Sequence, residues 1–211
     1  MTARMMARVL AMAVLLILYL PIFGLLRLFG GGNFLVRSYL GWVGWLLGLR
    51  IRVVGTPVRG NALYVANHIS WLDIPALGGS VFVRRQSRSE TRVQANAVSV
   101  ALTEGRPVVL FPEAGTGDGV TLSTFRASLF VSANEAGVAV QPVVLDYGAR
   151  QAEIAWPHGA GFVSEMKRML NRPAPVGLTL HFLPPLDGAT VDRKQLASQT
   201  HGAIAKVLGL D

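Results

Sequence analysis

The chain has 211 residues, which is enough for one domain with a substantial core and a short appendage but short for two full domains. Hydrophobic residues make up 51% and charged residues only 15%, too apolar a balance for an ordinary cytosolic protein, so part of the surface is expected to contact lipid. The net charge of +8 favours a membrane over nucleic acid because no nucleic-acid-binding signature accompanies it, and the absence of cysteine excludes disulfides, thiolate zinc sites and a cysteine nucleophile.

The first 49 residues predict a helical hairpin associated with a membrane. An uncharged run from Val9 to Leu26 is borderline in length for spanning a bilayer. Glycines 30 to 32 interrupt it, and a second apolar segment covers Phe34 to Leu49. Arginines and tryptophans near the ends of both segments fit a hairpin lodged in one leaflet about as well as a single span. The arginines favour the cytoplasmic side of the membrane and are Arg4, Arg8, Arg27, Arg37 and Arg50.

Residues 50 to 211 predict an α/β domain, because strand-like apolar runs alternate there with helical spacings. Strands are expected at 51–54, 62–66, 81–83, 108–111, 138–145 and 177–183. Helices are expected after Trp71 and at 89–103, 125–135, 162–170 and 192–208, with a loop at 151–161. The central strands are apolar without alternation, which is typical of a sheet buried on both sides. The predicted fold is therefore a mixed sheet covered by helices on both faces and preceded by an apolar two-helix membrane motif.

The strongest candidate for a catalytic base directly follows the strand at 62–66. Histidine has an unperturbed pKa of about 6.5, so His68 can take a proton from a hydroxyl at neutral pH and later return it. Asp73 lies five residues on, and its carboxylate would orient the imidazole ring and stabilise the imidazolium. On one straight helix this offset turns the two side chains about 140° apart. A strand-to-helix turn between them is needed to bring them together.

The same segment also fits a purely structural interpretation. Ser70 and Asp73 have the spacing of a helix capping box, and Pro75 is typical of a first helical turn. Spacing alone leaves both interpretations open.

A second candidate segment, 111–119, follows the strand at 108–111. It contains Glu113, Gly115, Thr116 and Asp118, and open α/β sheets place their ligands at such strand ends. Its glycines would let a ligand approach the backbone, whose amides can hold an anionic group. A glycine-rich turn with solvated carboxylates explains this segment, taken alone, equally well.

Taken together, the two segments resemble the glycerolipid acyltransferase family, especially bacterial 1-acylglycerol-3-phosphate acyltransferases and lyso-ornithine lipid acyltransferases. The resemblance covers most of residues 34 to 208. It implies that His68 and Asp73 are the family's catalytic His-x4-Asp pair. It also implies that Glu113, with Gly115 and Thr116, belongs to the family's Glu-Gly-Thr block and binds substrate.

Two further blocks support this resemblance. Residues 79–85 resemble the family's second block, whose closing arginine, here Arg85, would contact the glycerol phosphate, and residues 140–143 resemble the fourth block. The chain departs from the family in length, because only residues 74–78 separate Asp73 from the second block where relatives usually carry a further strand and helix. This shortening would reduce the sheet and part of the wall that binds the acyl chain.

The resemblance implies transfer of a fatty acyl group from acyl-ACP or acyl-CoA to the free hydroxyl of lysophosphatidate, which gives phosphatidate. O-acylation of lyso-ornithine lipid is the alternative. In this scheme His68 is the general base, Asp73 orients it, and Glu113 and Arg85 position the headgroup, while backbone amides stabilise the oxyanion. No cofactor or metal is required, and no Gly-x-Ser-x-Gly elbow supports an acyl-enzyme. The expected partners are the lysolipid, the thioester carrier and membrane lipid, at the cytoplasmic face of a bacterial inner membrane.

Two hypotheses from other classes remain at this stage. A metal hydrolase would use His68, Asp73 and Glu113 as ligands, but the other histidines at 158, 181 and 201 lack the i,i+4 spacing of metal ligands. Those three histidines receive no functional role. A non-catalytic lipid-binding membrane protein is the stronger rival because of the shortened segment after Asp73.

Overall fold

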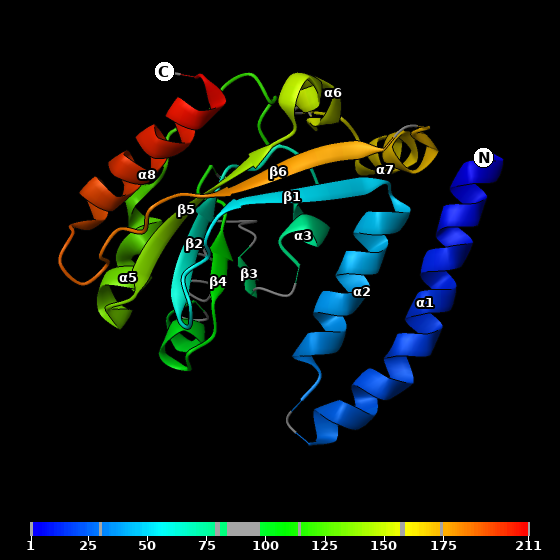
Figure 1. The fold of residues 1–211 in the computed structure, drawn as a ribbon, viewed down its shortest axis with the longest axis horizontal. Coiled ribbons are helices and arrows are strands. Elements are labelled where there is room, and N and C mark those ends of the chain that lie inside the picture. Colours follow the sequence, from blue (N-terminus) through cyan, green and yellow to red (C-terminus); the bar gives the residue numbers. More distant parts are fainter. Residues whose placement is uncertain are drawn as a thin grey trace. The chain divides into compact units, whose positions relative to one another are not determined.

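The computed structural model describes residues 2–29, 31–78, 81–83, 98–113, 115–156, 159–173 and 175–210 (Figure 1). The chain divides into two compact units. The first combines residues 1–51, 71–79 and 159–178, and the second combines 52–70, 80–158 and 179–211. The first unit therefore contains the predicted hairpin together with two later segments of the chain.

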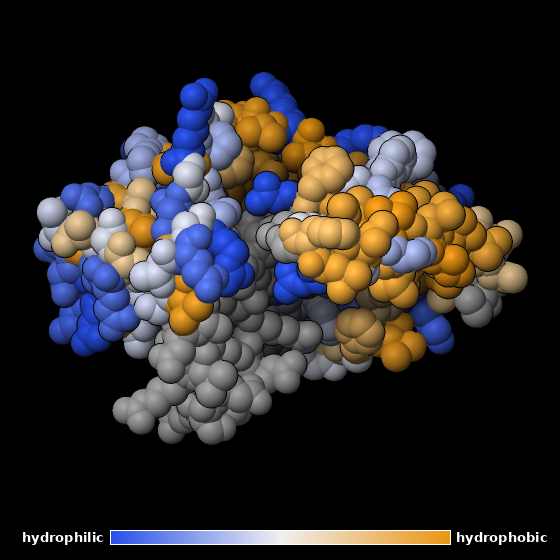
Figure 2. Space-filling view, turned by 90° about the horizontal axis from the view of Figure 1, so that it is seen from below, coloured by the Kyte–Doolittle hydropathy of each residue, from blue (hydrophilic) through white to orange (hydrophobic). Residues whose placement is uncertain are grey.

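Two consecutive helices begin the first unit, in the region predicted to form the hairpin. Helix α1 (Ala3–Leu28) runs through Pro21, and α2 (Asn33–Leu46) follows after the glycines. The Tyr19 hydroxyl and Ser38 Oγ share a hydrogen bond of 2.7 Å that joins the two helices. Among the described residues, α1 alone is long and apolar enough to cross a membrane. Its apolar side chains are largely uncovered, and Figure 2 shows apolar residues gathered over this part of the chain.

The charged start of α1 is bound to α7 (Phe162–Asn171) in the same unit. Arg8 Nη1 donates to the carbonyl oxygens of Leu170 and Arg172, both at 2.9 Å, and of Met169 at 3.3 Å. Arg4 Nη1 donates to the carbonyl of Asn171 at 3.1 Å. The last carbonyls of a helix lack partners within it and carry partial negative charge. The two arginines therefore cap the carboxyl end of α7 from a distant part of the sequence.

The strands form one six-stranded sheet in the order β1-β6-β5-β2-β4-β3. Its members are β1 (Leu49–Gly55), β2 (Ala62–Ala66), β3 (Val81–Val83), β4 (Val108–Leu110), β5 (Ala139–Asp146) and β6 (Val176–Phe182). β2 pairs in parallel with β4 and β5, β3 pairs in parallel with β4, and β5 pairs antiparallel with β6. The predicted mixed sheet is confirmed, and all the predicted strands are present.

The core of the second unit lies on one face of this sheet. Alternate residues of the central strands, such as Leu63 and Val65 in β2 and Val140 and Val144 in β5, contribute to one buried cluster. Helix α8 (Arg193–Leu208) covers the cluster together with η1 (Ala127–Phe130), α5 (Val131–Ala136) and a helical stretch at 98–103. This packing fixes the ends of β2 and β4 on a rigid base.

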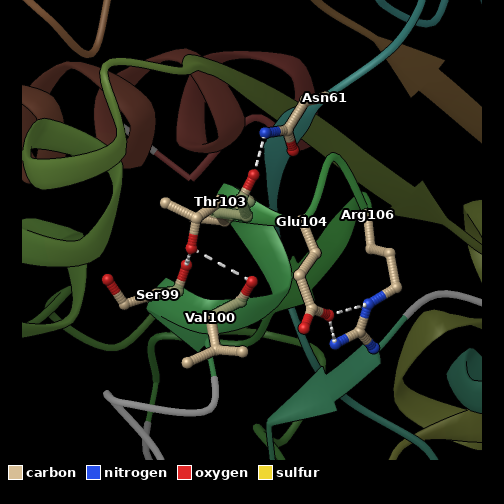
Figure 3. Close-up of polar contacts among 7 residues, drawn as sticks. Asn61, Ser99, Val100, Thr103, Glu104 and Arg106 are labelled. Carbon is tan, nitrogen blue, oxygen red and sulfur yellow. Dashed lines mark hydrogen bonds and ion pairs between the residues drawn. The ribbon is translucent and has the colours of Figure 1, made fainter.

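Figure 3 shows how the helical stretch at 98–103 is joined to the sheet. The side-chain amide of Asn61, just before β2, donates to the carbonyl of Leu102. At the exposed end of the stretch, Glu104 and Arg106 form an ion pair at 2.5 Å. This pair is more than two-fifths exposed on both sides, so it contributes little to stability.

Some element boundaries differ from those predicted. The segment expected as a loop from residue 151 begins with a short helix, α6 (Gln151–Ile154), preceded by η2 (Gly148–Arg150), so that prediction was wrong at its start. Single helical turns are too short to show helical periodicity in a sequence. The helix after Trp71 is also a single turn, α3 (Asp73–Ala76). Of the helix expected at 89–103, residues 98–103 lie within the described part and are helical.

Candidate functional site

The site lies at the carboxyl ends of two neighbouring parallel strands. β2 ends at Ala66 and β4 at Leu110, and the two strands pair in parallel with Val65 opposite Leu110. The segments that leave them carry His68 and Glu113. Because parallel strands end at the same edge of a sheet, the two candidate segments meet there. The sequence places them 45 residues apart, and the structure joins them by a hydrogen bond.

Asn67 makes the turn after β2 possible. Its side chain donates from Nδ2 to the carbonyl of Leu145 at 3.0 Å and accepts from the Leu145 amide at Oδ1 at 2.8 Å. The side chain thus replaces the next backbone rung of the β2–β5 ladder, in which Ala66 is opposite Val143. Asn67 is 1% exposed, so this double hydrogen bond is shielded from water. The backbone of the following residue is therefore released from the sheet to make other contacts.

His68 is held by its backbone and by its ring. Its amide donates to Glu113 Oε1 at 2.8 Å, and its carbonyl accepts from the Gly117 amide at 2.6 Å. The imidazole stacks on the Phe111 ring, with centroids 4.2 Å apart and an interplanar angle of 21°. These contacts fix the ring at the edge of the sheet. Fixed geometry of this kind is what a general base requires.

Glu113 joins the two loops of the site. Besides the His68 amide, its carboxylate accepts from the Ser123 amide through Oε2 at 3.2 Å. The side chain is 9% exposed, and both of these donors are backbone N–H groups. The carboxylate therefore acts as an acceptor that ties the loop after β2 to the loop around residue 123.

Asp118 stabilises the turn between Glu113 and Ser123. Its Oδ1 accepts from the amides of Val120 and Thr121, both at 2.8 Å. These two backbone hydrogen bonds hold the pKa of Asp118 below its ordinary value. Gly119 follows at φ +76°, and a Cβ there would lie 2.9 Å from the carbonyl of Gln151, so this turn requires glycine.

The backbone of Trp156 makes further hydrogen bonds between the loops of the site. Its amide donates to the carbonyl of Ile69 at 2.7 Å, and its carbonyl accepts from the Thr116 hydroxyl at 3.1 Å. Thr116 thus links the glutamate loop to the loop after His68, and Gly115 lies exposed beside it. Of the predicted site residues, the structure therefore brings together His68, Glu113 and Thr116. Phe111, Ser123 and Trp156 join them through ring and backbone contacts that no sequence pattern indicates.

Asp73 and Arg85 are the remaining predicted site residues. Asp73 is fully buried and is the first residue of α3. Leu72 rather than Ser70 is the N-cap of α3, and its side chain makes no capping hydrogen bond, which disagrees with the capping-box interpretation. Arg85 lies outside the described residues.

The residues that resemble the fourth block lie inside β5, away from the loops. Gln141 is buried there, and its Nε2 donates to the carbonyls of Thr56 and Leu183, both at 2.9 Å. It has a role in holding connections between strands. Within the described part of the chain, no three His, Asp or Glu side chains gather where they could bind a metal ion.

Comparison with known proteins gives consistent results. The family model described as Acyltransferase matches residues 76–146. The lyso-ornithine lipid O-acyltransferase of Pseudomonas aeruginosa is 32% identical over 203 residues, which cover 82% of this chain and 78% of that protein. The 1-acyl-sn-glycerol-3-phosphate acyltransferase of Neisseria gonorrhoeae is 37% identical over 123 residues, covering 44% of this chain and 48% of that protein.

A solved structure shares the fold. The crystal structure of the 1-acyl-sn-glycerophosphate acyltransferase of Thermotoga maritima matches 97% of this chain and 93% of that chain, with a TM-score of 0.69 at 19% identity. The alignment with the Pseudomonas enzyme extends over 203 residues, whereas only 82% of the 211 residues of this chain take part in it. That relative therefore carries residues within the aligned stretch that this chain lacks.

Proposed function

Because this chain belongs to the lysophospholipid-type acyltransferase family, we propose that it transfers a fatty acyl group from an acyl-ACP or acyl-CoA thioester to the free hydroxyl of a lysolipid. The observation that carries the proposal is the clamp on His68. Its amide and carbonyl bind Glu113 and Gly117, so the imidazole stands at the end of β2 as a fixed base. The hydrogen bond from the His68 amide to Glu113 joins residues of the His-x4-Asp and Glu-Gly-Thr blocks at one sheet edge, which supports this proposal.

In the proposed reaction, His68 removes the proton from the lysolipid hydroxyl as its oxygen attacks the thioester carbonyl. A tetrahedral intermediate forms, the carbon–sulfur bond breaks, and the thiolate leaves with the proton that His68 held. Asp73 is the proposed orienting partner of His68, in keeping with its place in the His-x4-Asp motif. Arg85 is proposed to contact the polar headgroup, with Gly115 and Thr116 beside it.

Glu113 supports the reaction in a way that differs from the sequence-based expectation. Its carboxylate accepts two backbone N–H groups, from His68 and Ser123, so its first contribution is to hold the loop of the base. Binding of the headgroup remains a proposed second contribution of this residue.

For the acceptor, we propose lyso-ornithine lipid ahead of lysophosphatidate, which the sequence analysis placed first. Relatives named for lyso-ornithine lipid match over most of their length, 78% in Pseudomonas aeruginosa and 77% in Brucella abortus. The 1-acyl-sn-glycerol-3-phosphate acyltransferase of Neisseria gonorrhoeae matches over only 48% of its own length. Membership of the family covers both acceptors, so lysophosphatidate stays the second candidate.

The long apolar surface of α1 supports a place in the membrane, and we propose the cytoplasmic face of a bacterial inner membrane. The relatives from Pseudomonas and Neisseria are bacterial enzymes of lipid acylation, and lysolipid and product both reside in a bilayer. The hairpin of α1 and α2 would hold the catalytic unit where its acceptor lies.

The test measures acyl transfer by the purified full-length protein in detergent. The protein is given a labelled acyl donor together with either lyso-ornithine lipid or lysophosphatidate, and the products are separated by thin-layer chromatography. We expect labelled ornithine lipid, and His68→Ala should remove it because a positioned base contributes about 10² to 10⁴ in rate. His181→Ala is the matched control, since this histidine in β6, whose Nε2 lies 3.6 Å from Asp146 Oδ2, has no role in the proposed reaction. Absence of product from the wild type with both acceptors would instead favour a non-catalytic lipid-binding protein.

A further inference from the structure

His201, which the sequence analysis left without a role, is connected to the site through one peptide group. It lies in α8, where its Nε2 is 3.3 Å from the carbonyl oxygen of Leu122. A carbonyl oxygen can only accept, so the ring must carry its proton on Nε2 and donate. Its ring also meets Phe125 edge to face, with centroids 5.0 Å apart at 81°.

The Leu122 carbonyl, which accepts from His201, belongs to the same peptide group as the Ser123 amide, which donates to Glu113. The Leu122 carbonyl and the Ser123 amide form one rigid plane, with the C=O and the N–H pointing in opposite directions. The Ser123 amide donates to Glu113 Oε2, and Glu113 Oε1 accepts from the His68 amide. A rotation that breaks the bond at one side of the plane therefore breaks the bond at the other.

We propose that His201 is a positioning residue of the acyltransferase, which fixes the Leu122–Ser123 peptide so that Ser123 holds Glu113 and Glu113 holds His68. The chain of contacts runs from imidazole to peptide, from peptide to carboxylate and from carboxylate to the backbone of the base. Hydrogen bonds in series polarise one another, which strengthens the bond at Glu113.

Helix α8 is a suitable reference point for this alignment. Leu196 and Ile204 are fully buried, and together with Ala197 they anchor the helix in the core of the second unit. Most residues of the loop from Asp118 to Ser123 are exposed, while Leu122 packs against the core cluster to which α8 contributes. A donor on the rigid helix therefore adds a fixed contact to those that set the orientation of the Leu122–Ser123 peptide. The inference rests on the proposed role of His68, because positioning matters to turnover only if His68 is the base.

The test separates the donor from the packing of the ring. His201→Met keeps an apolar side chain against Phe125 but has no N–H, whereas His201→Gln can place an amide N–H near the position of Nε2. We expect His201→Met to lower kcat about three- to tenfold, the loss that removal of one hydrogen bond implies, with KM unchanged. His201→Gln should stay within about twofold of wild type. Equal loss in both variants, or no loss in His201→Met, would overturn the proposal.

A double-mutant cycle distinguishes alignment through Glu113 from a general effect on the fold. If His201 acts through Glu113, adding His201→Met to Glu113→Gln should cause no further loss of kcat, whereas independent effects would multiply. Multiplication of the two effects would count against the proposed chain of contacts.

A measurement without turnover keeps this inference separate from the proposed function. Hydrogen exchange of the Ser123 amide, followed by NMR of the full chain in detergent micelles, should be faster in His201→Met and restored in His201→Gln. If the wild type has no acyltransferase activity and this pattern is still seen, the proposed function fails while the positioning of Glu113 by His201 stands. Unchanged exchange in His201→Met would refute the positioning itself.

Discussion

Glu113→Gln is expected to damage the protein although it replaces one oxygen by a nitrogen of similar size. The carboxylate accepts from the His68 amide at 2.8 Å and from the Ser123 amide at 3.2 Å. A glutamine amide has one oxygen for these two donors, so its NH₂ group must face a backbone N–H. One charge-assisted hydrogen bond is lost and the other becomes neutral.

The magnitude follows from these two changes. Loss of a hydrogen bond to a charged group costs about 1.5 to 3 kcal/mol, and weakening of the second adds about 0.5 to 1 kcal/mol, so the total is about 2 to 4 kcal/mol. Little of this is screened by water, because Glu113 is 9% exposed. For a chain of this length each kcal/mol lowers Tm by about 2 to 4 °C, so we expect a fall of about 5 to 15 °C.

The assay compares thermal unfolding of purified full-length variants in one detergent at one scan rate. Glu104→Gln is the matched control, since it makes the same chemical change in an exposed ion pair with Arg106 and should cost about 0.5 kcal/mol or less. A Tm for Glu113→Gln that falls no further than that of Glu104→Gln would refute the conclusion that Glu113 joins the two loops.

Three further predictions rest on the same kind of contact. Asn67→Leu leaves the buried amide and carbonyl of Leu145 without the Asn67 side chain as their partner, so it should destabilise the protein by about 2 to 4 kcal/mol and lower kcat. An unchanged Tm would show that the Asn67 side chain does not extend the hydrogen bonding between β2 and β5. Arg8→Ala removes the cap from α7 and should lower the free energy of unfolding by about 1 to 3 kcal/mol, which thermal unfolding would detect as a lower Tm. Arg27→Ala, at the other end of α1, is the control. The folded state lowers the pKa of Asp118, so this carboxylate stabilises the protein at pH values above its ordinary pKa of 3.8, and the stabilisation is lost as the pH falls below that value. The difference in Tm between the wild type and Asp118→Ala should therefore shrink as the pH is lowered below 3.8. A difference in Tm that does not change with pH would contradict this prediction.

Local patterns predicted the framework of this protein better than its site. The strands at 62–66 and 138–145 were recognisable because buried strands are apolar without interruption, and the observed β2 and β5 lie within one residue of them. His68 and Glu113 were recognisable because each follows such a strand. Their mutual hydrogen bond depends on the parallel pairing of β2 with β4, which no local pattern specifies.

Other features of the site depend on single side chains that compete with backbone pairing. Asn67 occupies a rung of the sheet with its side chain, and the short helix α6 brings Trp156 back toward Ile69. Arg4 and Arg8 were interpreted as markers of the cytoplasmic side, and the structure additionally gives them partners at the end of α7. Such long-range partners follow from the fold and are invisible in the order of residues.

The capping of α7 by Arg8 has a consequence for the order in which the protein is made. Arg8 leaves the ribosome more than 150 residues before the carbonyls of Leu170 and Arg172 that it binds, separated from them by 162 and 164 positions. Helices α1 and α2 can therefore enter a membrane while the last quarter of the chain is still being synthesised. The first unit is completed only when residues 159–178 emerge, so insertion of α1 and α2 into a membrane can precede its assembly. An affinity tag is accordingly better placed after Leu210 than before Thr2, where it would crowd the arginines as they receive their late partner.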